Sequence, residues 1–246
     1  MSQPFIFRKQ IYSLIIAVIL LIAGLLFSVH IALIQVVIFY FLKLLVFTFA
    51  PQIRQKLRYP LLIHTMIFIS PYLVPFIFVP YNNVEANNLH GLILGVVISS
   101  VLLLSNFKHI RQQFSPSNYL LSFGIDRSEF YNSLISSSIS IIGEELFFRY
   151  FMISLLSQVV GVYAIFISAV LFTHSHYINR WANVKFNLRS YIYQFIIGVL
   201  LGMLFYYKKS IVGCVVSHFI FNLPTNIILL KRFRNTNGEV NYFGDY

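Results

Sequence analysis

The feature that most constrains this chain is a series of apolar runs, each about as long as a membrane is thick. A helix needs about 20 apolar residues to cross the hydrocarbon core of a bilayer. Runs of this kind lie at 11–29, 31–50, 60–79, 89–105, 128–158, 161–178, 189–207 and 211–230. They predict an all-α fold, a polytopic membrane bundle of about eight transmembrane helices.

Charged residues are scarce, and the basic ones gather between the apolar runs. Only 10% of the residues are charged, against roughly 25% in soluble domains. The formal net charge is +11, but short basic clusters between spans are typical of the loops of a membrane protein rather than of a nucleic-acid-binding face. We therefore predict that the chain's surroundings are a lipid bilayer and that nucleic acid is not a partner.

The distribution of lysine and arginine predicts the orientation in the membrane. With eight spans the two termini share one side, and most basic residues fall on that side. They are Arg8, Lys9, Arg54, Lys56, Arg58, Lys108, Arg111, Arg127, Arg180, Lys185, Arg189, Lys231, Arg232 and Arg234. The other side receives only Lys208 and Lys209, while Lys43 and Arg149 lie within spans. The positive-inside rule therefore places both termini in the cytoplasm. The abundance of Phe, Ile, Asn and Lys is typical of a protein from an AT-rich bacterial genome, so we expect the membrane to be a bacterial plasma membrane.

Four segments follow from this pattern. The N-terminal four spans occupy 1–105, a polar cytoplasmic loop occupies 106–127, the C-terminal four spans occupy 128–230, and a polar cytoplasmic tail occupies 231–246. The ionisable residues that lie inside C-terminal spans form three clusters. An ionisable side chain inside a membrane is costly and marks a candidate functional site.

The first cluster is the stretch IIGEELFFRYF, which places Glu144, Glu145 and Arg149 among apolar residues. Glu145 and Arg149 are four residues apart in the favourable order, so they can form an ion pair on one helix face. Glu144 is rotated about 100° from Glu145 and lacks this partner. A structural ion pair therefore explains Glu145 and Arg149, and Glu144 is left as a candidate general base.

The other two clusters follow on the next spans. Phe172 and His176 share one helix face, and so do His218 and Asn222 in the last span. If the chain turns near residue 160, Glu144 and His176 are each sixteen residues from the turn and lie at similar depth. His218 and Asn222 can both donate hydrogen bonds toward a developing negative charge. Taken singly, such residues are more often interhelical hydrogen-bond partners.

In this order the three clusters resemble the signatures EExxxR, FxxxH and HxxxN of the CAAX prenyl protease and bacteriocin-processing (CPBP, or Abi) family of intramembrane glutamate proteases. The resemblance covers roughly residues 125–230. It implies that 128–230 is a catalytic core that hydrolyses a peptide bond without a nucleophilic side chain and without a cofactor. Glu144 and His176 would activate a water, with Glu144 as general base, and His218 and Asn222 would stabilise the oxyanion.

The resemblance also implies supporting residues and a class of substrate. Glu145, Arg149 and Phe172 would hold the site in shape. The substrate would be a membrane-associated peptide or a membrane protein. The expected roles are the processing of a peptide pheromone or bacteriocin precursor, or self-immunity to a bacteriocin.

Three alternatives remain open at this point. Glu144, His176 and His218 could hold Zn²⁺ with an open position for water, as in a membrane metalloprotease. Cys214, His218 and Asn222 share a helix face and could form a thiol triad, although a lone cysteine in an apolar helix is usually a packing residue. A non-catalytic scaffold, regulator, immunity protein or transporter would use the polar residues without hydrolysis.

Overall fold

The computed structural model describes residues 5–27, 30–57, 61–78, 88–114, 124–178 and 187–242, and every regular element within these residues is helical. The elements are α1 (Phe5–Leu26), α2 (Ile31–Leu57), α3 (Leu61–Leu73), α4 (Pro75–Phe78), α5 (Leu89–Ser105), α6 (Phe107–Gln113), α7 (Arg127–Glu145), the π-helix η2 (Leu146–Ile153), α8 (Ser154–Val160), α9 (Tyr163–Ile178), α10 (Leu188–Lys208) and α11 (Ile211–Tyr242). The predicted fold class, an all-α membrane bundle, is confirmed.

Four of the described helices contain a stretch long and apolar enough to cross a membrane. These stretches are Arg8–Leu26, Ile31–Phe49, Leu188–Lys208 and Ile211–Asn235. Shorter apolar helices cover Ile63–Leu73, Leu89–Ser105 and Tyr163–Ile178. The remaining predicted span corresponds to α7, η2 and α8, which follow one another without a break from residue 127 to residue 160.

Side-chain caps fix where several helices begin. Asp126 accepts a hydrogen bond of 2.6 Å from the backbone N–H of Glu129 at the start of α7. Asn187 does the same for Ser190 at the start of α10, at 2.9 Å. Each cap satisfies a backbone donor that has no partner within the helix. The turn after α8 is made by Gly161, whose φ of +57° suits glycine, so the hairpin predicted near residue 160 is present.

The structure departs from the expected segments in three places. The loop predicted at 106–127 contains the short helix α6, and the run at 60–79 is divided into α3 and α4 between Pro71 and Pro75. The tail predicted at 231–246 continues α11 as far as Tyr242, because its polar residues extend a helix that already has packing partners. Arg58, Arg180, Lys185 and the segments 115–123 and 243–246 lie outside the described residues.

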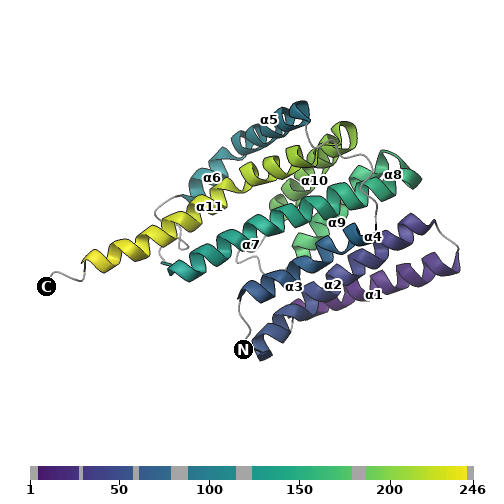
Figure 1. Cartoon of the computed structure of the whole chain (residues 1–246), viewed down its shortest axis with the longest axis horizontal. Helices are drawn as coiled ribbons and strands as arrows, with labels where there is room; N and C mark the ends of the chain where they lie inside the picture. Colours follow the sequence, from purple (N-terminus) through teal and green to yellow (C-terminus); the bar gives the residue numbers. More distant parts are fainter. Residues whose placement is uncertain are drawn as a thin grey trace.

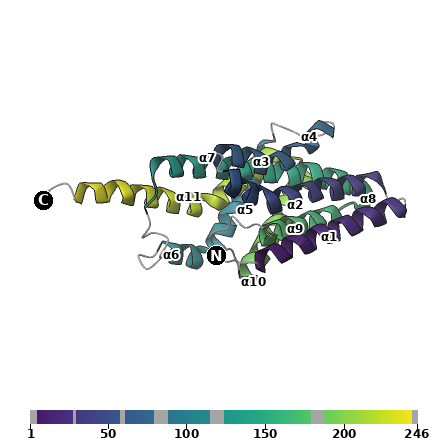
Figure 2. The same ribbon diagram turned by 90° about the horizontal axis from the view of Figure 1, so that it is seen from below.

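The helices lie side by side along the long axis of the molecule, and α7 runs through the middle (Figure 1). In that view α2 and α3 lie on one side of α7, and α11 and α5 lie on the other. The C-terminal part of α11 extends beyond the other helices, as Figure 2 also shows. The middle helix α7 therefore lies between the N-terminal helices and α11.

Glycines allow two helix pairs to approach closely. A Cβ atom on Gly213 of α11 would meet the carbonyl group of Gly91 on α5, and one on Gly95 would meet the carbonyl of Gly213. At the second pair a Cβ on Gly198 of α10 would lie 2.9 Å from the Cβ of Ala169 on α9. Small residues of this kind are the usual basis of tight helix packing in membranes. They set the positions of α9 and α11, which carry the second and third polar clusters.

We expect Gly213→Ala to separate α5 from α11, because the added methyl group has no space against the backbone of α5. The expected loss is about 1–3 kcal/mol of unfolding free energy, as for other overpacked sites. Thermal unfolding in detergent measures it. Gly24→Ala is the matched control, because its Cβ would lie at an ordinary contact distance of 3.6 Å from Ile34. Equal stability of the two variants would contradict the close-packing interpretation.

Candidate active site

The first cluster lies where the middle helix changes its winding. Glu144 and Glu145 are the last residues of α7, and Leu146 begins the π-helix. A π-helix has wider turns than an α-helix and is frequently found at functional sites. Glu145 and Arg149 are completely buried, whereas Glu144 is partly buried. Sequence patterns had not indicated the change of winding.

Glu145 has two charged or polar partners. Its Oε2 lies 3.1 Å from Arg149 Nε, so the ion pair expected from their spacing is present. Its Oε1 accepts a hydrogen bond of 2.7 Å from Nδ1 of His218 on α11. The spacing of the clusters had not indicated this contact between His218 and Glu145. One carboxylate therefore joins the middle helix to α11.

Phe172 lies at the centre of the supporting contacts. The guanidinium carbon of Arg149 lies 4.5 Å from the centroid of its ring. The rings of His176 and His218 lie 4.6 and 6.2 Å from it, centroid to centroid. The Phe172 side chain is completely buried. It therefore packs against the guanidinium and the two imidazoles, which gives the aromatic residue of the second cluster a structural role.

The hydrogen bond made by His176 indicates which ring nitrogen carries a proton. Nδ1 lies 3.0 Å from the backbone carbonyl oxygen of Phe172. A carbonyl oxygen can only accept, so Nδ1 is the donor. In the neutral ring Nε2 then has a lone pair and can accept a hydrogen bond. His176 is partly buried, as a residue that contacts a substrate or water has to be.

Glu144 and Glu145 of the middle helix face different neighbouring helices. Glu144 interacts electrostatically with His176 of α9, with Lys43 of α2 and with the hydroxyl of Tyr72 on α3. None of the hydrogen bonds found among the described residues joins Glu144 directly to His176. Glu144 and His176 are therefore within electrostatic range of each other without a direct hydrogen bond among those found. His218 is also within electrostatic range of His176.

Asn222 lies one turn after His218 on α11 and is partly buried. No hydrogen bond of its side chain is found within the described part of the chain. The predicted site residues from the three clusters thus come from α7, α9 and α11, and the structure brings Glu144, His176 and His218 within electrostatic range of one another through His176. Their catalytic roles stay predictions.

Sequence reasoning missed two residues near Glu144. Lys43 and Tyr72 come from the N-terminal helices, which carry none of the three clusters. Lys43 had a signal that could have found it, since it is an ionisable residue inside an apolar span. Tyr72 had none, because a tyrosine in a membrane helix is common. Only the packing of α3 against α7 places it beside Glu144.

The geometry bears on the two chemical alternatives. The Cys214 thiol is completely buried and donates to the backbone carbonyl of Leu201 at 3.4 Å. His218 directs its Nδ1 to Glu145 instead of to this thiol. Within the described residues no three His, Cys, Asp or Glu side chains are arranged to hold a metal ion.

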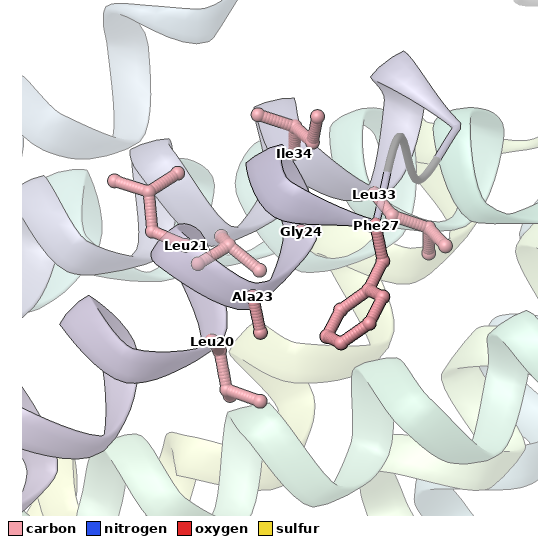
Figure 3. Close-up of a pocket in the computed structure, with 8 residues that line it drawn as sticks. Leu20, Leu21, Ala23, Gly24, Phe27, Leu33 and Ile34 are labelled. Atoms are coloured by element: carbon pink, nitrogen blue, oxygen red, sulfur yellow. The ribbon is translucent and has the colours of Figure 1, made fainter.

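The hollow in Figure 3 lies elsewhere, between α1 and α2. Its lining residues are Leu20, Leu21, Ala23, Gly24, Phe27, Leu33, Ile34 and Val37. All of them are apolar, and none belongs to the three clusters. This hollow therefore offers no group that could activate a water or stabilise a charge, and the polar cluster around Glu144 remains the candidate active site.

Comparison with known proteins supports the resemblance found in the sequence. Residues 126–224 match the model of a family described as type II CAAX prenyl endopeptidase Rce1-like. The matched segment begins just before α7 and ends within α11 at Pro224, so it contains all three clusters. No curated protein and no solved structure matches the chain.

We expect Glu145→Ala to destabilise the fold, because the charge of Arg149 would remain buried without its carboxylate. Removing one member of a buried ion pair typically costs about 3–5 kcal/mol. Chemical unfolding in detergent measures the loss. Glu129→Ala is the control on the same helix, since Glu129 is exposed and its loss should cost about 1 kcal/mol or less. Comparable losses for both variants would show that Glu145 does not have the structural role assigned to it.

Proposed function

We propose that this chain is a membrane-embedded endopeptidase that cleaves its substrate with a water activated by Glu144 and His176. The match of residues 126–224 to the family described as type II CAAX prenyl endopeptidase Rce1-like supports this proposal. The observation that carries the proposal is the convergence of Glu144, His176 and His218 from three helices on one site within an apolar bundle. These groups can accept a proton, hold a water and donate to an oxyanion. No side-chain nucleophile is required.

Water activation is assigned to the pair Glu144 and His176. A water bridging the two side chains would donate one hydrogen bond to the Glu144 carboxylate and one to Nε2 of His176. Glu144 takes a proton as the water oxygen attacks the carbonyl carbon of the scissile bond. When the C–N bond breaks, the same proton passes to the leaving nitrogen, so Glu144 returns to its ionised form.

Stabilisation of the oxyanion is assigned to His218 and Asn222. His218 already donates from Nδ1 to Glu145, so it can donate from Nε2 to substrate only as the imidazolium. Asn222, one turn further along α11, supplies an uncharged N–H₂ donor. In this scheme Glu145 acts through His218 and does not contact the substrate.

The substrate is proposed to be a peptide or protein segment held in the membrane. The processing of a peptide pheromone or a bacteriocin precursor fits this description, as does self-immunity to a bacteriocin. We place the enzyme in a bacterial plasma membrane with both termini in the cytoplasm, because the basic loops favour that orientation. Hydrolysis is proposed to need no cofactor.

The central test is Glu144→Gln, which removes the base and preserves the size of the side chain. We expect the rate of peptide hydrolysis to fall by at least 10²–10⁴-fold, the usual contribution of general acid–base catalysis. Comparative peptidomics of membranes and medium from cells with either form measures the loss. The control is retention of helical circular dichroism and of a monodisperse elution profile. A peptide profile unchanged by Glu144→Gln would instead favour a scaffold or immunity protein.

A second test separates the proposed mechanism from thiol and metal chemistry. Cys214→Ala should retain full activity, because the thiol contacts a backbone carbonyl and takes no part in the proposed steps. Incubation with a strong chelator should likewise leave the rate unchanged. Activity lost to the chelator and restored by added zinc would overturn the metal-free mechanism. Loss of activity in Cys214→Ala with normal thermal stability would revive the thiol triad.

A further inference from the structure

Lys43 is a buried cation in the N-terminal half of the chain. Its side chain is completely buried on α2, and its Nζ makes no hydrogen bond. Aromatic rings surround the ammonium group instead. The distances from Nζ to the ring centroids are 4.3 Å for Phe148, 4.9 Å for Phe47, 5.1 Å for Tyr72, 5.4 Å for Tyr40 and 5.8 Å for Phe147. Two of these rings, Phe147 and Phe148, follow Glu144 and Glu145 in the sequence after the intervening Leu146.

The aromatic rings explain only part of this environment. The face of an aromatic ring attracts a cation, but it removes none of the net charge. A buried ammonium group without a carboxylate nearby would lose its proton or destabilise the fold. A Lys43 side chain that keeps its charge at this position therefore requires an anion within electrostatic range.

Glu144 is the carboxylate that meets this requirement. Lys43 and Glu144 are within electrostatic range of each other, and Tyr72 lies near both: its ring centroid is 5.1 Å from Nζ, and its hydroxyl is within electrostatic range of the carboxylate. The packing there is close, since a Cβ on Gly143 would lie 3.2 Å from the Cβ of Tyr72. Glu145 is already engaged by Arg149 and His218. His174 and His176 of α9 are also within electrostatic range of Lys43, and the Tyr40 ring centroid lies 5.4 Å from its Nζ.

From this geometry we infer that Lys43 is a positioning residue of the active site, the counter-ion that holds the Glu144 carboxylate between α2, α3 and α9. The middle helix then contains two charge pairs that face opposite sides. Arg149 compensates Glu145 toward α11, and Lys43 compensates Glu144 toward α2. The ammonium is enclosed by rings, so it acts on the reaction through Glu144 and does not contact substrate.

The inferred charge pair is testable without any substrate. In a double-mutant cycle the melting temperature is measured in detergent for the unmodified chain, Lys43→Met, Glu144→Gln and the double variant. Glu144→Gln should lower the melting temperature when Lys43 is present, because the ammonium loses its counter-charge. The same substitution should have little effect, or raise the melting temperature, in the Lys43→Met background. Additive changes would overturn the inference.

The contribution to catalysis rests on the proposed function and is measured separately. Lys43→Met should lower kcat on the order of 10²-fold with little change in KM, as a misplaced catalytic group does. Lys43→Arg, which retains the charge, should restore part of the rate. Lys9→Met is the matched control. Lys9 also lies over a tyrosine ring, with its Nζ 4.1 Å from the centroid of Tyr177. Its side chain is exposed, and no contact between Lys9 and Glu144 is found among the described residues.

The two measurements distinguish the possible failures. Full activity of Lys43→Met, or a loss that Lys43→Arg does not relieve at all, would overturn the positioning role. Full activity of Glu144→Gln would remove the proposed function, while a coupled double-mutant cycle would still establish the charge pair. A loss of activity in Lys9→Met equal to that in Lys43→Met would show a general effect of removing a lysine and would also overturn the inference.

Discussion

The interaction on which the rest of the structure depends is the shared carboxylate of Glu145. Taking an ion out of water into an apolar interior costs several kcal/mol even after relaxation. Glu145 and Arg149 meet this cost together, and His218 adds a short hydrogen bond to the same carboxylate. Because Arg149 also lies over Phe172, one charge pair fixes the relative positions of the middle helix, α9 and α11.

The fold could be predicted from the sequence to the extent that it depends on the length of apolar runs. The helical spans and the turn at Gly161 follow from that pattern and from the preference of glycine for positive φ. The π-helix after Glu145 could not be predicted, because its turns are stabilised by contacts from other helices and not by local propensity. The helical continuation of α11 to Tyr242 was missed for a related reason, since polar residues alone do not end a helix.

The site shows the same limit at the level of side chains. Spacing along one helix predicted the pair of Glu145 and Arg149, because residues four apart are neighbours on the helix surface. Spacing cannot decide which of two adjacent glutamates faces which neighbouring helix. That depends on the rotation of α7 within the bundle, so the hydrogen bond between His218 and Glu145 could not be predicted from spacing. The structure thus gives His218 a carboxylate partner on the middle helix.

The division of the chain into N-terminal spans and a C-terminal core follows the positions of the motifs. The residues around Glu144, however, come from both parts. The matched segment begins at residue 126, yet the environment of Glu144 includes Lys43 and Tyr72 from α2 and α3. A carboxylate that must stay ionised inside a membrane needs its positive partner wherever that partner lies in the sequence. Short motifs on three helices can therefore specify the reacting groups, while the charge balance that lets them work is completed by helices without a motif.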